Sequence, residues 1–331
     1  MESNAPLQQL FFQHIKLLLP AHLSLVDVVA ELLHLSNDSA YRRIRNETPL
    51  TIDETVLLAS RFGLSLDQFC KKDSETFLFS GKLANATDHV FESWMENTVQ
   101  QLQFINSFEN KHIYYLAKDI PLMQQFLVPE LMAFKSFFWR KSILHYEGLR
   151  GKQFSLTDIH PHHLELAGKI EMLYNQIPST DIWNIESINS TIRQIEFYRS
   201  ANAFETADDL KRLYASVLRL MDHIEHQAEA GLKFSVGGKP QPTAVAFHLF
   251  NNELILGDNT VLAVLNNTKL TFLNHSVINF VGTRDERFNA HMFDAIQNLI
   301  RRSTQLSSTS EKERTRFFHR IREKIKQASR L

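Results

Sequence analysis

The spacing of apolar residues changes at Gly231, and this change constrains the fold more than any other feature of the chain. Throughout residues 207–230, apolar side chains recur at intervals of three and four residues. They are Leu210, Leu213, Tyr214, Val217, Leu220, Met221 and Ile224. These intervals predict an amphipathic helix, which Gly231 is placed to end. After Gly231, short apolar runs alternate with Asn, Gly and Asp, a pattern typical of strands joined by tight turns.

Two pairs of apolar runs near the end of the chain predict β-hairpins, because two Asn residues separate the members of each pair. Consecutive Asn residues tolerate the positive φ angles of a tight hairpin turn. The pairs are 243–250 with 253–256 and 261–265 with 269–273, and a further strand is expected at 277–281. We therefore expect an α+β part in which an antiparallel β-meander is followed by two closing helices, at 286–302 and 311–328.

Residues 88–231 show helical periodicity interrupted by Pro and Gly, and they predict an α-helical domain. A chain of 331 residues exceeds the usual domain length of roughly 100 to 200 residues. We expect three domains: an N-terminal domain at 1–75, the helical domain at 88–231 and the α+β part at 240–331. The predicted fold class is therefore mainly α.

Capping boxes predict where the helices of the N-terminal domain begin. In a capping box a Ser or Thr side chain accepts a backbone hydrogen bond, and an acid or amide three residues later returns one. Such pairs are Ser24 with Asp27, Thr51 with Glu54 and Ser65 with Gln68. We expect a bundle of five short helices, at 7–19, 24–33, 38–45, 52–62 and 66–69. Its small core is expected to include Tyr41, Ile44, Val56 and Leu57.

Residues 43–55 and 58–69 resemble the second half of the phage-repressor (lambda-repressor-like) helix-turn-helix. The similarity includes the capped helix that begins after Thr51 and the turn Gly63-Leu64-Ser65-Leu66-Asp67 that follows it. The family usually has Gly where this chain has His34, and again just after the third helix, where it has Asn46 or Glu47. The resemblance implies a transcriptional regulator whose third helix lies in the DNA major groove.

The residues of the predicted third helix favour contact with DNA independently of this resemblance. Ser and Asn side chains bond to base edges or to the backbone, and Arg contacts a guanine edge or a phosphate. The predicted DNA-binding residues are Asn37, Asp38, Ser39, Arg42, Arg43, Arg45 and Asn46. The alternative is a solvated helix face, since residues 1–75 carry seven basic and ten acidic side chains.

The charge of the chain is unevenly distributed. A formal net charge of −1 excludes a uniformly basic protein that coats nucleic acid. Residues 299–331 nonetheless hold ten basic and three acidic side chains. Four cations of the last predicted helix are candidates for contact with phosphates or with a partner: Arg314, Arg316, Arg320 and Lys324. The alternative for this helix is a solvated face docked on the C-terminal sheet.

The sequence contains no Gly-rich phosphate loop and no nucleophile motif, so we predict neither an enzyme nor a cofactor. His160 and His162, together with Asp158, are spaced to share a cation, but no zinc signature surrounds them. We predict no metal there, and instead the exposed first turn of a helix beginning at Pro161. A single cysteine, Cys70, excludes an intramolecular disulfide and indicates a reducing compartment.

These patterns together predict a cytoplasmic transcriptional regulator that binds double-stranded DNA as a homodimer. No apolar run approaches the roughly 18 to 20 residues of a membrane-spanning helix, so no membrane span is expected. The later domains are expected to dimerise and to respond to a small-molecule or protein effector. The alternative is a protein-interaction scaffold whose helical bundle does not bind DNA.

Overall fold

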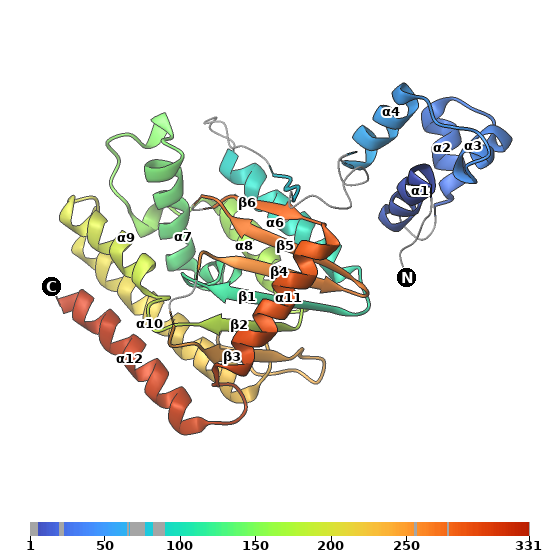
Figure 1. Ribbon diagram of the computed structural model, residues 1–331. Coiled ribbons are helices and arrows are strands. Elements are labelled where there is room, and N and C mark those ends of the chain that lie inside the picture. Colours follow the sequence, from blue (N-terminus) through green and yellow to red (C-terminus); the bar gives the residue numbers. More distant parts are fainter. Residues whose placement is uncertain are drawn as a thin grey trace. The chain divides into compact units, whose positions relative to one another are not determined.

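A computed structural model describes residues 6–19, 23–64, 66, 77–81, 90–254, 257–276 and 278–330 of the chain. The chain divides into two units, residues 1–78 and 79–331 (Figure 1). Each unit has its own apolar core. No helix in the described part of the chain is both long and apolar enough to cross a membrane.

The described part of the first unit consists of four helices. They are α1 (Leu7–Leu18), α2 (Leu25–Leu33), α3 (Asn37–Ile44) and α4 (Ile52–Phe62). Each begins and ends within one residue of its predicted limits, and side-chain caps form at the predicted starts of α2 and α4. The Ser24 hydroxyl accepts from the Asp27 amide, and Thr51 and Glu54 form a reciprocal capping box. The helix predicted at 66–69, apart from Leu66, lies outside the described residues, as does Ser65.

The core of the first unit differs in part from the predicted one. It is built on Phe11, Phe12, Ile15, Val29, Ala30, Ala40, Leu58 and Ala59. The prediction that Tyr41, Val56 and Leu57 are buried is wrong, since these side chains are 47%, 48% and 45% exposed. In α3 the small side chain of Ala40 is fully buried, with Ile44 one turn later beside it. Because each helical residue advances by about 100°, burial of Ala40 turns Tyr41 outward.

A seven-stranded mixed sheet organises the second unit, with strand order β6-β5-β4-β1-β2-β3-β7. Its strands are β1 (Lys111–Ala117), β2 (Ser179–Trp183), β3 (Phe247–Asn251), β4 (Thr260–Leu265), β5 (Thr268–Asn274), β6 (Phe280–Thr283) and β7 (Thr304–Gln305). The adjacent strands β1, β2 and β3 are parallel, and the remaining pairs are antiparallel.

Helices cover both faces of this sheet (Figure 1). One face packs on the main core, to which α6 (Val90–Asn106), α7 (Pro129–Phe138), α8 (Pro161–Tyr174), α9 (Asn189–Ser200), α10 (Ala207–Ala230) and α12 (Glu311–Arg330) contribute. Helix α11 (Glu286–Arg301) covers the other face through a smaller cluster around Leu116, Ile182 and Ile296. Short 3-10 turns lie at Leu122–Phe126, Glu147–Leu149 and Leu156–Asp158, and a π-helical turn at Trp139–Ile143 extends α7.

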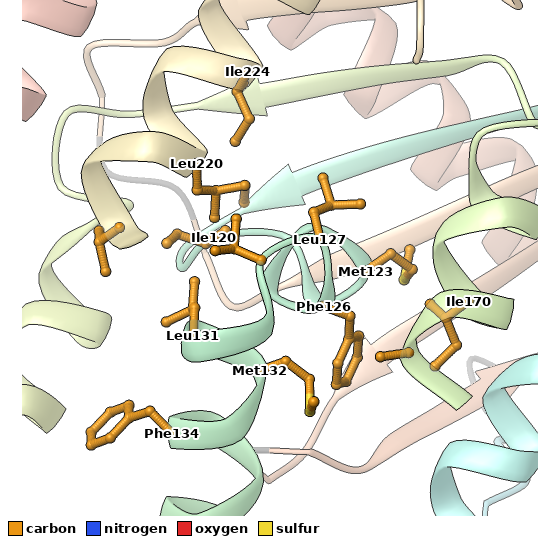
Figure 2. Packing of buried hydrophobic residues seen from close by; sticks show 14 of the residues in the cluster. Ile120, Met123, Phe126, Leu127, Leu131, Met132, Phe134, Ile170, Leu220 and Ile224 are labelled. Carbon is orange, nitrogen blue, oxygen red and sulfur yellow. The ribbon is translucent and has the colours of Figure 1, made fainter. Parts of the chain in front are cut away.

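The segment between β1 and α8 forms the centre of the main core. Figure 2 shows apolar side chains of the 3-10 turn after β1 and of α7 meeting others from α8 and α10. The labelled residues are Ile120, Met123, Phe126, Leu127, Leu131, Met132, Phe134, Ile170, Leu220 and Ile224. All ten are less than a tenth exposed, so the aromatic and apolar residues of this region are structural.

The predicted fold class, mainly α with a separate antiparallel β-meander, is wrong. The described residues form eleven α-helices and one mixed sheet, 56% helical and 14% strand, so the fold is α+β. Residues 111–117 and 179–183, which the sequence assigned to an α-helical domain, form the central strands β1 and β2. The parallel pairs therefore join this region and the C-terminal residues in one sheet.

Burial on both faces explains why these strands were missed. Every residue of β2 is buried, so its side chains show no alternation of apolar and polar positions. Periodicity alone does not distinguish such a strand from a buried helical turn. As far as the described residues 252–254 show, no strand follows Asn251 to complete the hairpin predicted there, because Asn252 donates its amide to the carbonyl of Trp183. The hairpin predicted at Asn266 is confirmed between β4 and β5, and Asn266 has a φ of 50°.

Candidate nucleic-acid interface

Two residues with left-handed backbone conformations, His34 and Asn46, lie before and after α3. His34 ends α2 with a φ of 53°, and only Leu35 separates it from Ser36, whose hydroxyl caps α3 by accepting from the Ser39 amide. Asn46 follows α3 with a φ of 63°. These are the positions where the phage-repressor family usually has Gly, the residue that adopts positive φ most readily. The backbone of this chain therefore has the conformation that Gly favours, although its residues differ.

One face of α3 is open to solvent. Asp38, Tyr41, Arg42 and Arg45 follow one another at the helical spacing of i, i+3, i+4 and i+7. The side chains of Arg42 and Arg45 are 62% and 59% exposed. The Arg42 Nε atom lies 3.7 Å from Asp38, and the Arg45 guanidinium lies 5.2 Å from the centre of the Tyr41 ring. Exposed contacts of this kind contribute about 0 to 1 kcal/mol, so both guanidinium groups are available to another anion.

Arg43 occupies a different position from its two neighbours. Its Nε donates to both carboxylate oxygens of Glu54 at 3.1 Å, and its Nη1 donates to the Ser39 carbonyl. Burial alone would raise the pKa of Glu54, but hydrogen bonds from Arg43 and from the Thr51 backbone outweigh it and lower that pKa. Arg43 therefore ties α3 to the start of α4 instead of facing outward.

The remaining predicted DNA-binding residues divide in the same way. Asn37 is exposed at the start of α3 and donates from Nδ2 to Asp27 Oδ1 at 3.1 Å. Asn46 is also exposed, whereas the half-buried Ser39 accepts from the Ser36 hydroxyl. The structure thus brings Asn37, Asp38, Arg42 and Arg45 to the surface around α3, and it adds Tyr41, which the sequence placed in the core. The burial of Ala40 is the signal that distinguishes the two faces.

The four candidate cations of α12 also separate into two pairs. Arg314 is buried and donates to the carbonyls of Leu306 and Thr309. Lys324 pairs with Glu186 at 2.7 Å. Arg314 and Lys324 therefore hold α12 in place. Arg316 and Arg320 are exposed on α12, and within the described residues neither has a carboxylate partner.

The predicted histidine pair is dispersed around the first turn of α8. His160 immediately precedes Pro161, and its ring lies 4.6 Å from that of His163. His162 points instead toward Glu96 and Glu165, at 3.8 and 3.7 Å. In the part of the chain that the structure describes, no three His, Cys, Asp or Glu side chains are grouped to hold a metal ion. Cys70 lies outside the described residues.

The second unit contains a buried ion pair that the sequence did not indicate. Lys135 of α7 is fully buried, and its Nζ lies 2.8 Å from Gln194 Oε1 and 3.4 Å from Asp119 Oδ2. Burial lowers the pKa of Lys135, and the charge of Asp119 partly opposes this. Asp119 also accepts from the Thr191 hydroxyl. These bonds fix the loop after β1 against α7 and α9.

No family model, curated protein or solved structure matches the chain. The resemblance of residues 43–69 to the phage-repressor helix-turn-helix therefore rests on the sequence of those residues.

Proposed function

We propose that this chain is a DNA-binding transcriptional regulator and that α3 reads the DNA major groove. The exposed face of α3 carries this proposal, because it presents Asn37, Tyr41, Arg42 and Arg45 on a short capped helix. A major groove about 12 Å wide admits one α-helix. Arg contacts the guanine edge with two hydrogen bonds and Asn contacts the adenine edge in the same way. Arg43 contributes by holding α3 in position.

The proposal includes a homodimer. An eight-residue helix offers about two turns to the groove, which is too few contacts for a specific site. Two-fold related helices spaced by about 34 to 36 Å double these contacts and read symmetric half-sites. The second unit, with its separate core, is the part proposed to respond to an effector.

A protein-interaction scaffold remains the second candidate, and the surface of α4 favours it. Ile52 is 82% exposed, and Val56 one turn later is 48% exposed. The two side chains lie on one face of α4, where they would contribute apolar contact area to a partner. In this reading the same unit holds a partner and does not contact DNA.

Fluorescence anisotropy with a random-sequence duplex at increasing salt concentrations tests the proposal. If Arg42 and Arg45 each contact a phosphate, the double variant Arg42→Ala, Arg45→Ala should reduce the slope of log K against log salt by about 1.8. Arg61→Ala is the matched control, because Arg61 is an exposed arginine near the end of α4. An unchanged slope in the double variant would remove α3 as the DNA-contacting element.

A further inference from the structure

Three hydrogen-bonded polar side chains connect helices α6, α7 and α8 of the second unit. Ser136 of α7 and Glu92 of α6 lie on either side of His163 of α8: Ser136 Oγ is 2.9 Å from His163 Nδ1, and His163 Nε2 is 2.8 Å from Glu92 Oε1. Burial lowers the pKa of His163 to about 4, although the hydrogen bond to Glu92 opposes this shift. His163 is therefore neutral at neutral pH.

The protonation states fix the direction of both hydrogen bonds. Burial alone would raise the pKa of Glu92, but the hydrogen bond with His163 and the charges nearby lower it, so Glu92 is ionised. His163 then donates from Nε2 to Glu92 and accepts at Nδ1 from the Ser136 hydroxyl. None of these three side chains is a cation at neutral pH, and within the described residues Glu92 Oε2 is buried without a hydrogen-bond partner.

A small pocket opens beside these three side chains. Ser136, His163, His160, Arg140 and Asp158 supply its polar wall, and the remaining lining is largely apolar. The volume that the centre of a water molecule can occupy in this pocket is about 20 Å³. One water molecule needs roughly 10 to 15 Å³ by the same measure, so the pocket accommodates one or two waters or the head of a small ligand.

Among the described residues Arg140 makes no direct ion pair in this wall, and the charge that acts most on it is that of Glu92, which raises the pKa of Arg140 from beyond 4.0 Å. Its Nε donates to the Ser136 carbonyl at 3.3 Å. Within the described residues, no carboxylate lies within 4.0 Å of its guanidinium nitrogens, although the side chain is only partly exposed. Burial lowers the pKa of Arg140, but an arginine keeps its proton in proteins. Glu92 compensates this charge without a direct hydrogen bond, so a ligand anion in the pocket would supply the hydrogen bonds that the half-buried guanidinium group does not make with Glu92.

We propose that this pocket binds the carboxylate group of a small monoanionic organic molecule, with Arg140 as its principal contact. A guanidinium group presents two parallel N–H bonds that match the two oxygens of a carboxylate. The apolar lining, which includes Phe137 and Phe154, suits a short hydrocarbon portion. Asp158 at the pocket and the ionised Glu92 disfavour a dianion, because Arg140 is the one cation in the wall to balance it. The site lies wholly in the second unit and does not depend on DNA binding.

Calorimetric titration of the full chain with butyrate tests this proposal, with butyramide, phosphate and chloride at equal ionic strength as comparison ligands. Butyrate should bind saturably, while neutral butyramide should not bind and phosphate should bind more weakly. Arg140→Met should weaken butyrate binding by about tenfold or more. Arg150→Met is the matched control, because the Arg150 side chain is 85% exposed and outside the pocket, and it should leave binding unchanged.

A variant that gains affinity keeps the test independent of folding defects. Asp158 is exposed, so Asp158→Asn should leave the fold intact while removing a repulsive charge. We expect it to tighten butyrate binding by about twofold or more. Butyrate binding no stronger than that of chloride, tighter binding of phosphate than of butyrate, or full binding by Arg140→Met would each overturn the proposal.

Discussion

The pairing of Arg43 with Glu54 makes a prediction that separates the structural arginine of α3 from its exposed neighbours. The two side chains are only 15% and 17% exposed, and Arg43 Nη2 lies 2.8 Å from Glu54 Oε1. Exposed ion pairs contribute about 0 to 1 kcal/mol, whereas loss of one partner from a fully buried pair costs about 3 to 5 kcal/mol. This pair lies between these limits, so Arg43→Ala should lower the local stability of α3 by about 2 kcal/mol.

Glu54→Ala should cost more than Arg43→Ala, because it also removes the capping box with Thr51, which contributes about 1 kcal/mol. The double variant should cost less than the sum of the single variants, with a coupling energy of about 1 to 2 kcal/mol. Hydrogen exchange of the α3 amides in the full chain measures local opening directly. A loss of 2 kcal/mol corresponds to about thirtyfold faster exchange when opening is at equilibrium.

The same experiment has a clear contrary result. If Arg43→Ala leaves exchange in α3 unchanged but lowers the salt slope of DNA binding, then Arg43 is a DNA contact and not a tie between helices. Arg61→Ala should change neither quantity by a comparable amount, and it controls for the loss of one positive charge.

Two further predictions concern the second unit. The pKa of His163 is lowered to about 4 from its ordinary value of 6.5, so the unfolded chain binds this proton at a higher pH than the folded chain, and stability should fall as pH decreases from about 6.5 to 4. Thermal unfolding of His163→Gln should show a smaller fall in stability over this pH range, and an equal fall would contradict the assignment. Gly231→Ala should destabilise the protein by about 1 kcal/mol or more, because Gly231 has a φ of 67° and a Cβ there would overlap the Ser308 hydroxyl. Gly168→Ala in α8 should instead stabilise it by about 0.5 to 1 kcal/mol, since a Cβ there meets no atom within 4 Å. Denaturant titration of both variants gives the comparison, and equal destabilisation would contradict it.

The helices of the first unit were predictable because their signals are local. Each predicted cap involves residues three apart, and Ser24 and Thr51 both accept the backbone hydrogen bonds that their positions predict. The orientation of α3 was not predictable in the same way, because it depends on packing. Tyr41 and Ile44 are three residues apart and share a face in a helical projection, yet the close fit of Ala40 rotates Tyr41 outward.

The sheet and the pocket were not predictable because their signals are distant in sequence. The parallel strands β1 and β2 are separated by α7 and α8, and the burial of all of β2 and of most of the second half of β1 removes the alternation that identifies a surface strand. The hydrogen bonds among Glu92, Ser136 and His163 likewise join three helices. These residues are far apart in the sequence, so no local spacing predicts the contact. The role of Arg43 also became apparent only when α4 placed Glu54 beside it.

The most direct test of the proposed function is to sequence the DNA fragments that the purified full chain retains from a random duplex pool, with Arg42→Ala, Arg45→Ala as the comparison. We predict that the unaltered chain enriches two-fold symmetric sites whose half-sites are about 10 to 10.5 base pairs apart, or a multiple of that spacing. The double variant should lose this enrichment. Retention of no common sequence by the unaltered chain, or the same sequences by both proteins, would contradict the assignment of α3 as the DNA-reading helix.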